Sequence, residues 1–248
     1  MRRHALFCAL AASALLASCT ADSLRPGLDI GARTASVPRL LNPKTYAPKS
    51  FAMSLRPDLP GFGEASMPVE EVDCRKDLSR MGVKFRDLPA ISEGACGIDW
   101  PVEVSGFSGA AVKPAAVLNC TMAATFARWT RKELAPAIRG RYFTGIGTIH
   151  TGSTYSCRSM IGAGTSKLSE HAKGNAIDIM GITLDNGKDV DVRKPGLFAF
   201  RQKSLLASVR TDACDYFSTV LGPGYNKEHA DHFHFDMMER RSGYKACK

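Results

Sequence analysis

The sequence predicts an α+β domain in which two helices pack on one face of a small antiparallel sheet. Two stretches have apolar residues at helical spacing, the one that contains Leu118, Met122, Phe126 and Trp129 and the one over residues 198–217. Three other stretches alternate in the manner of strands, at Val102 and Val104, over residues 176–184 and over residues 232–235. The aromatic stripe that includes Trp129 is expected to bury in the core, because apolar helix faces usually pack against another layer.

The N-terminus has the pattern of a bacterial secretion signal. Arg2 and Arg3 precede an apolar run over residues 5–17, which is too short for a transmembrane span. Leu-Ala-Ser-Cys, ending at Cys19, resembles a lipobox, so we expect residues 1–19 to be a lipoprotein signal peptide and Cys19 to carry a lipid anchor. The alternative is an ordinary signal that is cleaved nearby.

Thr20, rather than an Asp, follows this cysteine, which resembles lipoproteins sorted to the outer membrane. The expected location is therefore the periplasm, with a lipid anchor in the outer membrane. Residues 20–67 contain six prolines and no sustained apolar period, and are expected to form a Pro-rich tether. Residues 68–248 have the length of one domain with its own core.

Six cysteines lie beyond Cys19, and none of them forms a Cys-x-x-Cys pair. An even number in an exported chain indicates disulfides rather than a thiolate metal site. Six cysteines allow fifteen connectivities, and sequential pairing is the arrangement that we carry forward. It joins Cys74 to Cys96, Cys120 to Cys157 and Cys214 to Cys247.

The remaining elements follow in chain order. A short helix is expected over residues 75–81, and the amphipathic helix follows Pro114. Residues 142–149 have strand-forming residues interrupted by Gly145 and Gly147, which indicates a bulge or a close backbone approach. His150, at the end of this strand, is expected to be structural. After the strand over residues 176–184, a turn at residues 185–187 precedes the second helix.

Four of the six histidines fall in two places, at His171 and within residues 229–234. His171, Asp178 and one of the late histidines would give zinc (Zn²⁺) two imidazoles and one carboxylate. This is the ligand count of a catalytic site, which keeps a fourth position for water or substrate. Because side chains alternate along a strand, His232 and His234 are expected on one face, with Phe233 and Phe235 toward the core.

The pattern Ser169-x-His171-x-x-Gly174-x-Ala176-x-Asp178, followed by His232-x-His234, resembles the LAS metallopeptidases. This group contains the D-Ala-D-Ala peptidases, the lysostaphin-type endopeptidases and the hedgehog domain. Within it the chain is most similar to the extensin-like C-terminal domain family, which shares features with the penicillin-insensitive murein endopeptidases. The resemblance is strong over roughly the last hundred residues, and implies that the small sheet carries a zinc site.

The resemblance implies that His171, Asp178 and His234 are the metal ligands. His232 and His229 are then the candidates for the acid/base role. Asp231 occupies the position at which the dipeptidase branch has a general-base Glu, but on a regular strand it would face away from His232.

Three further residues occupy positions that the metallopeptidase pattern assigns to particular roles. Arg158 corresponds to an arginine that contacts the substrate or the developing oxyanion in these enzymes, although Cys157 separates it from Tyr155. Its alternative role is that of a surface arginine beside a disulfide. Ser169 and Gly174 are expected to shape the loop, by a side-chain hydrogen bond and by a tight bend.

Charge is consistent with a cell-wall partner. Removing residues 1–19 takes Arg2 and Arg3 from 33 basic residues, so 31 remain against 24 acidic ones and the net charge is +7. A basic surface favours a polyanionic polymer. No basic cluster is interleaved with aromatic residues, which argues against nucleic acid as a partner.

These observations predict an exported zinc peptidase that cuts peptidoglycan stem peptides or cross-links, of D,D-endopeptidase or carboxypeptidase type. Zinc would activate a water molecule and polarise the scissile carbonyl. The alternative is a non-catalytic module that binds peptidoglycan and tethers the outer membrane to the wall, and a third is a hydrolase acting on another amide. The sequence leaves the oligomeric state open.

Overall fold

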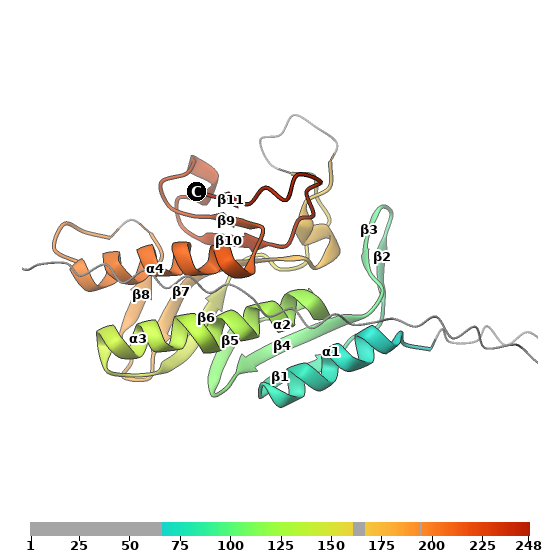
Figure 1. Cartoon of the computed structure of the whole chain (residues 1–248), viewed down its shortest axis with the longest axis horizontal. Coiled ribbons are helices and arrows are strands. Elements are labelled where there is room, and N and C mark those ends of the chain that lie inside the picture. The colour runs from blue at the N-terminus through green and yellow to red at the C-terminus, as the bar shows by residue number, and fades with distance from the viewer. Residues whose placement is uncertain (1–65, 161–166, 194) are drawn as a thin grey trace, which may run out of the picture. The chain divides into compact units, whose positions relative to one another are not determined.

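The structure, a computed structural model, describes residues 66–160, 167–193 and 195–248, and these residues form an α+β domain (Figure 1). Its centre is a nine-stranded sheet in the order β1-β4-β5-β6-β7-β10-β9-β11, with β8 paired to β7. The strands are β1 (Val83–Asp87), β4 (Pro101–Phe107), β5 (Ala110–Asn119), β6 (Ile146–Thr151), β7 (Ala176–Leu184), β8 (Asp189–Asp191), β9 (Thr219–Leu221), β10 (Phe233–Asp236) and β11 (Ala246–Cys247). A separate hairpin pairs β2 (Ile91–Glu93) with β3 (Cys96–Ile98).

The prediction of a small antiparallel sheet was wrong in size and in strand direction. β5 pairs with β6 in parallel, as β11 does with β9, so the sheet is mixed. Several of its strands have only two or three residues. Strands this short are too brief to show an alternating apolar pattern, which is why the sequence did not reveal them.

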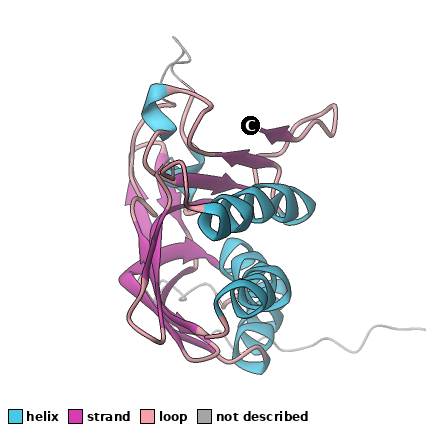
Figure 2. Cartoon of the chain, turned by 90° about the vertical axis from the view of Figure 1, so that its left-hand side faces the viewer, coloured by secondary structure: helices cyan, strands magenta, loops and turns pink. Residues whose placement is uncertain are grey.

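The long helices cover one face of the sheet, as the sequence predicted (Figure 2). They are α1 (Val69–Arg80), α2 (Cys120–Trp129), α3 (Ala135–Tyr142) and α4 (Phe200–Tyr216). A π-helical turn, η1 (Thr130–Leu134), joins α2 to α3. No helix among the described residues combines the length and the apolar character that crossing a membrane requires.

Three predicted boundaries need correction, and the first is that α1 begins at Val69 rather than at residue 75. Leu118 belongs to β5, and α2 begins at Cys120 because Asn119 caps it, its side-chain oxygen accepting a hydrogen bond from the Met122 amide at 2.8 Å. The strand expected over residues 142–149 begins only at Ile146, after Tyr142 has ended α3. The bulge expected near Gly147 is present, because the β6–β7 register shifts between Ile146 and Thr148.

An aromatic cluster fills the space between the helices and the sheet. Trp129 is 1% exposed and meets Phe235 edge-on, with ring centroids 5.2 Å apart. Phe126 and Phe217 also pack against Trp129. The structural role predicted for Trp129 is therefore confirmed.

Three disulfides join Cys74 to Cys120, Cys96 to Cys157 and Cys214 to Cys247. The expectation of disulfides is confirmed, as is the last predicted pair, but the two earlier pairs were wrong. Helix α1 packs on α2, which brings Cys74 to Cys120, and this contact cannot be read from spacing along the chain.

The predicted signal peptide, Cys19 and the predicted tether up to residue 65 lie outside the described residues.

Candidate metal centre

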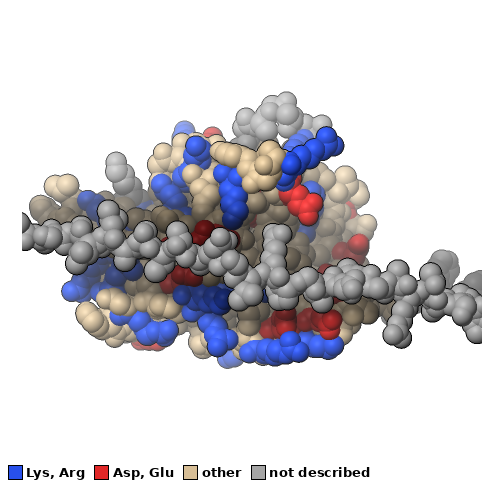
Figure 3. All heavy atoms as spheres, viewed as in Figure 1, with Lys and Arg blue, Asp and Glu red and all other residues tan. Residues whose placement is uncertain are grey.

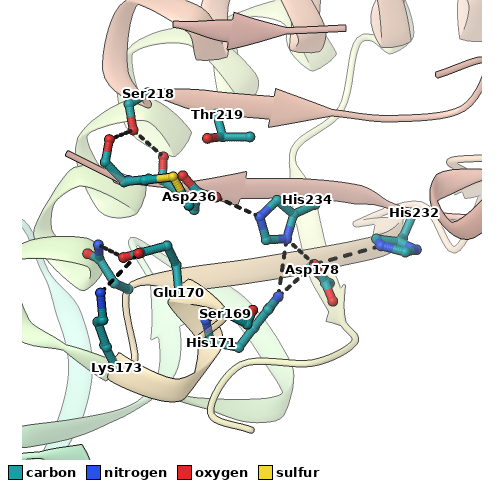
Figure 4. A network of polar contacts seen from close by, with 12 residues as sticks. Ser169, Glu170, His171, Lys173, Asp178, Ser218, Thr219, His232, His234 and Asp236 are labelled. Carbon is teal, nitrogen blue, oxygen red and sulfur yellow. Dashed lines mark hydrogen bonds and ion pairs between the residues drawn. The ribbon is translucent and has the colours of Figure 1, made fainter. Parts of the chain in front are cut away.

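Three elements, two of them consecutive in the chain and the third far along it, bring His171, Asp178 and His234 together (Figure 4). Asp178 lies on β7 and His234 on the antiparallel neighbour β10, and the two residues are direct partners in the register. His171 comes from a short 3-10 helix, η2 (Glu170–Lys173), which immediately precedes β7. The β7–β10 pairing therefore sets two members of the cluster, and the η2 turn adds the third.

Ser169 and Gly174 shape this turn, as the sequence predicted. The Ser169 side chain accepts a hydrogen bond from the His171 amide at 3.3 Å and so caps η2. Gly174 ends η2 with φ of +59°, and a Cβ there would lie 2.8 Å from the backbone nitrogen of Asn119. A larger residue would therefore clash with backbone as well as strain the turn.

The three candidate ligand atoms fit a tetrahedral metal. Nδ1 of His234 is 3.0 Å from Oδ1 of Asp178 and 3.1 Å from Nε2 of His171. Nε2 of His171 lies 3.3 Å from the same carboxylate oxygen. Ligands about 2.0 Å from a tetrahedral zinc lie about 3.3 Å from one another, so a zinc ion fits among these atoms with little rearrangement.

Outer hydrogen bonds fix which nitrogen each histidine offers. Nδ1 of His171 donates to the carbonyl of Thr154 at 2.7 Å, which leaves the Nε2 lone pair directed at the cluster. Nε2 of His234 donates to Oδ2 of Asp236 at 3.0 Å, which leaves Nδ1 for the cluster. Metal-binding histidines characteristically donate their other nitrogen to a carbonyl or a carboxylate, and both ligand candidates do so here.

Asp236 is a site residue that the sequence reasoning missed. It is 4% exposed, and its other oxygen accepts a hydrogen bond from the Met238 amide at 2.9 Å. Its position two residues after His234 on a strand places both side chains on one face, and this spacing is a signal that the sequence does contain. The Thr154 carbonyl carries no such signal, because any residue type supplies one.

The electrostatics of the metal-free cluster favour a proton shared among the candidate ligands. Burial alone would lower the pKa of His234, but hydrogen bonds to Asp178 and Asp236 outweigh burial and raise that pKa to about 9. Burial would raise the pKa of Asp178, but hydrogen bonds with His171 and His234 hold it far below its ordinary value. A metal cation would replace the proton beside the Asp178 carboxylate.

His232 reaches the cluster from outside the strand. β10 begins at Phe233, so His232 precedes the strand in which it was expected, although its side chain faces the same Asp178 oxygen as that of His234, as predicted. Nδ1 of His232 donates to Asp231 at 2.9 Å, and its Nε2 lies 3.8 Å from Oδ1 of Asp178. Asp231, expected to face away from His232, instead orients that ring.

His229 lies at the end of η3 (Lys227–His229), beside His232 and His234. Its ring centroid is 5.2 Å from that of His232 and 5.8 Å from that of His234. Asn226 accepts hydrogen bonds from both the backbone amide and Nδ1 of His229, so Nε2 keeps its lone pair. Burial, with the neighbouring imidazoles, lowers the pKa of His229 to about 4.

The three predicted metal ligands and the three predicted catalytic residues all line one cavity of about 250 Å³. They are His171, Asp178 and His234, and Arg158, His229 and His232. Arg158 contributes to its wall, and its carbonyl accepts a hydrogen bond from the Ser169 amide at 3.0 Å. His150 lies elsewhere, with Nε2 2.7 Å from the Thr183 hydroxyl, as its predicted structural role requires. A larger cavity of about 390 Å³ beside α2 and α3 has no histidine in its lining, so the smaller cavity is the better candidate site.

A model of the family described as extensin-like protein C-terminus matches residues 72–248. The chain belongs to this family. No curated protein and no solved structure matches the chain. Kinship of this family with the D-Ala-D-Ala peptidases and murein endopeptidases stays a prediction from the residues.

Proposed function

We propose that the domain is a zinc-dependent peptidase that hydrolyses peptidoglycan stem peptides or their cross-links, of D,D-endopeptidase or carboxypeptidase type. The observation that carries this proposal is the triangle of His171 Nε2, Asp178 Oδ1 and His234 Nδ1 in the wall of the cavity, with edges of 3.0 to 3.3 Å. Three protein ligands are typical of catalytic zinc, whereas structural zinc sites usually have four.

His171, Asp178 and His234 would hold the metal, and the hydrogen bonds to Thr154 and Asp236 suit that role. When bound, zinc supplies Lewis-acid polarisation of a carbonyl and lowers the pKa of a coordinated water to about 7. The protein then has to move protons and to orient the peptide.

His232 is the first candidate for proton transfer. Its Nε2 faces the cluster while Asp231 holds Nδ1, so this nitrogen can accept a proton from the attacking water and return it to the leaving amine. The Asp231 side chain is 58% exposed and is itself turned to His232, which supports an orienting role rather than that of the base.

His229 is the second candidate. Its lowered pKa keeps the ring neutral near pH 7, and its hydrogen bond to Asn226 leaves Nε2 able to accept a proton. The close contact of the His229 and His232 rings allows the two residues to share acid and base steps.

Arg158 supplies a positive charge in the cavity wall. A guanidinium there can bind a substrate carboxylate or stabilise the negative charge that develops on a carbonyl oxygen. Either contact orients the peptide against the metal.

The substrate follows from the expected compartment. Three disulfides agree with an oxidising environment, and the sequence predicts a lipid anchor at Cys19 in the outer membrane. The abundant peptide polymer in that compartment is peptidoglycan. The proposal therefore places the enzyme in the periplasm, with peptidoglycan as its partner and no role for nucleic acid.

Incubation of the protein and zinc with purified muropeptides, followed by mass spectrometry, tests the proposal. New peptide termini are expected from the wild type, while His171→Ala, Asp178→Ala and His234→Ala should lose both bound zinc and activity. His150→Ala is the matched control and should keep both, because His150 lies outside the cavity.

Unchanged zinc stoichiometry in all three ligand variants would exclude this metal site. Intact muropeptides that nonetheless bind the protein would overturn the peptidase proposal in favour of the wall-binding module.

A further inference from the structure

Four large apolar side chains protrude from the end of the domain where α3 finishes and α4 starts. Phe143, Leu197, Phe198 and Phe200 are 84%, 74%, 82% and 69% exposed, and the first three are the most exposed large apolar residues in the described part of the chain. Single exposed apolar residues are ordinary, but a group of them marks an interaction surface.

The backbone of Phe143 makes its exposure more notable. Its φ is +56° and its ψ is 32°, which is a left-handed conformation that bulky residues rarely adopt. Glycine or asparagine commonly occupies this position after a helix. Phe143 gains no burial in compensation, so the fold does not explain its presence there.

The end of α3 and the start of α4, which carry these side chains, lie next to each other. The guanidinium of Arg141 donates to the hydroxyls of Ser204 and Ser208. Tyr142, which precedes Phe143, lines a shallow surface cavity together with Phe198 and Phe200. We call Phe143, Leu197, Phe198 and Phe200 the apolar tip.

Cations flank the apolar tip. Lys188 lies 5.2 Å above the Tyr142 ring, and Lys203 lies 5.9 Å above the Phe200 ring. Arg201 lines the same shallow cavity, and within the described ranges none of these three cations forms an ion pair. Blue Lys and Arg side chains are visible at this end in Figure 3.

Three carboxylates lie near this end of the domain, and one of them, Asp185, is beside Gly145. Asp189 accepts a hydrogen bond from the Thr183 hydroxyl at 2.6 Å, and Asp191 pairs with Arg193. Because Asp191 is paired, Asp185 and Asp189 remain against Arg141, Lys188, Arg201 and Lys203, so the net charge around the apolar tip is positive.

We propose that the apolar tip binds the surface of an anionic phospholipid bilayer. Phe143, Leu197, Phe198 and Phe200 insert at the level of the headgroups, while Lys188, Arg201 and Lys203 approach the lipid phosphates. Apolar side chains on one surface, flanked by Lys and Arg, are the pattern of interfacial membrane binding.

The chemistry of the apolar tip favours a bilayer over other partners. Leu and Phe side chains have no hydrogen-bonding group, whereas recognition of a sugar chain depends on such groups. The four side chains project from two separate segments, the end of α3 and the start of α4, which suits a deformable lipid surface better than a preformed protein partner. Their positive surroundings complement anionic headgroups.

Bilayer contact at this end leaves the candidate metal centre accessible. In Figure 1 the start of α4 and the end of α3 lie at the left, whereas η2, the tan helical turn that carries His171, lies at the right. The candidate metal centre and the lipid contact would then lie at different ends of the domain, and membrane binding requires neither zinc nor hydrolysis.

Vesicle flotation tests this proposal with the chain from Thr20 to Lys248, which leaves out the cysteine expected to carry lipid. Vesicles that contain phosphatidylglycerol should carry the protein, and vesicles of phosphatidylcholine alone should bind it at least about tenfold less. Phe198→Ser combined with Phe200→Ser should weaken flotation by about tenfold or more, because both side chains lose their insertion.

Two further variants sharpen the test. Phe143→Asn should also reduce flotation, and asparagine suits the left-handed backbone, so this variant should stay folded. The matched control is Val69→Ser, which removes a side chain of 70% exposure on α1, away from the apolar tip, and should bind vesicles as the wild type does.

Equal flotation of the wild type and the Phe198/Phe200 variant would overturn the proposal. So would a wild type that binds purified sacculi but not vesicles, or a self-association that the same variant abolishes, since either result would assign the apolar tip to another partner. Zinc content and muropeptide cleavage should be unchanged in the apolar-tip variants, so this test is independent of the peptidase proposal.

Discussion

The two faces of β10 differ sharply over only four residues, Phe233 to Asp236. Phe233 and Phe235 are 1% and 0% exposed and pack into the aromatic cluster with Phe217. His234 and Asp236, on the opposite face, hydrogen-bond to each other beside Asp178. One short strand therefore contributes both to the core of the domain and to its candidate metal centre.

The two faces of β10 are expected to serve different purposes, the aromatic face the stability of the fold and the polar face the binding of a metal. Burial of a phenylalanine favours the folded state through removal of apolar surface from water. A buried His–Asp pair adds little net stability, because desolvation offsets the attraction between the charges. We therefore expect changes on the aromatic face to affect mainly unfolding, and changes on the polar face to affect mainly metal affinity.

The largest expected effect is on the aromatic face. Phe235→Ala should lower the free energy of unfolding by about 3–5 kcal/mol, because it leaves a cavity beside Trp129 and Phe217. Urea denaturation measures this loss. Phe198→Ala is the matched control, and it should change stability by less than about 0.5 kcal/mol because that side chain is exposed. A small effect of Phe235→Ala would contradict the separation of the two faces.

The second effect is the pH dependence of the polar face. The folded pKa of His234, about 9, exceeds its ordinary value of 6.5. In metal-free protein its contribution to stability is therefore full below pH 6.5 and is lost as the pH rises through about 9. The pKa values of Asp178 and Asp236 are lowered, so their contribution is lost on acidification instead.

Zinc should reverse the alkaline part of this dependence, because the metal needs His234 without the proton on Nδ1. The increase in Tm caused by equimolar zinc should be larger near pH 9 than near pH 6.5. Thermal unfolding with zinc or with chelator at both pH values measures the difference. An increase in Tm that does not vary with pH would show that His234 is not a ligand.

The third effect concerns Asp236. Asp236→Asn should weaken zinc binding by about 10- to 100-fold, since the amide no longer fixes the His234 ring as a carboxylate does. Competition with a chromogenic chelator measures the affinity. Asp189→Asn is the matched control on β8, where the carboxylate contacts Thr183, and its zinc affinity should equal that of the wild type. Equal affinities for both variants would remove Asp236 from the site.

The smallest effect concerns Asp231 and depends on the proposed activity. If Asp231 only orients His232, Asp231→Asn should lower kcat by less than about tenfold and leave KM unchanged, as expected for an exposed pair. A loss of about 10²- to 10⁴-fold would instead identify Asp231 as the general base. Steady-state kinetics on a purified muropeptide distinguishes the two outcomes.

The sequence predicted much of the local geometry of the site. The alternation of Phe233 to Phe235 correctly placed both phenylalanines toward the core. Gly174 and Ser169 were correctly expected to shape the turn that holds His171. Local patterns determine such features, because backbone period and capping depend only on neighbouring residues.

Contacts between distant elements could not be predicted in the same way. The sequential disulfide pairs failed because α1 packs on α2, and the expected sheet was too small because its shortest strands depend on their neighbours for pairing. His232 reaches the cavity from a loop rather than from the strand.

By itself, then, the sequence determined the extensin-like family, the helices on one face of a sheet and a set of histidines and an aspartate that could hold a metal ion. Only the tertiary structure decided that Asp236 and the Thr154 carbonyl fix the ring nitrogens of His234 and His171. The physical reason is that a residue's type is local, whereas the partner of its hydrogen bond is set by the packing of the whole domain.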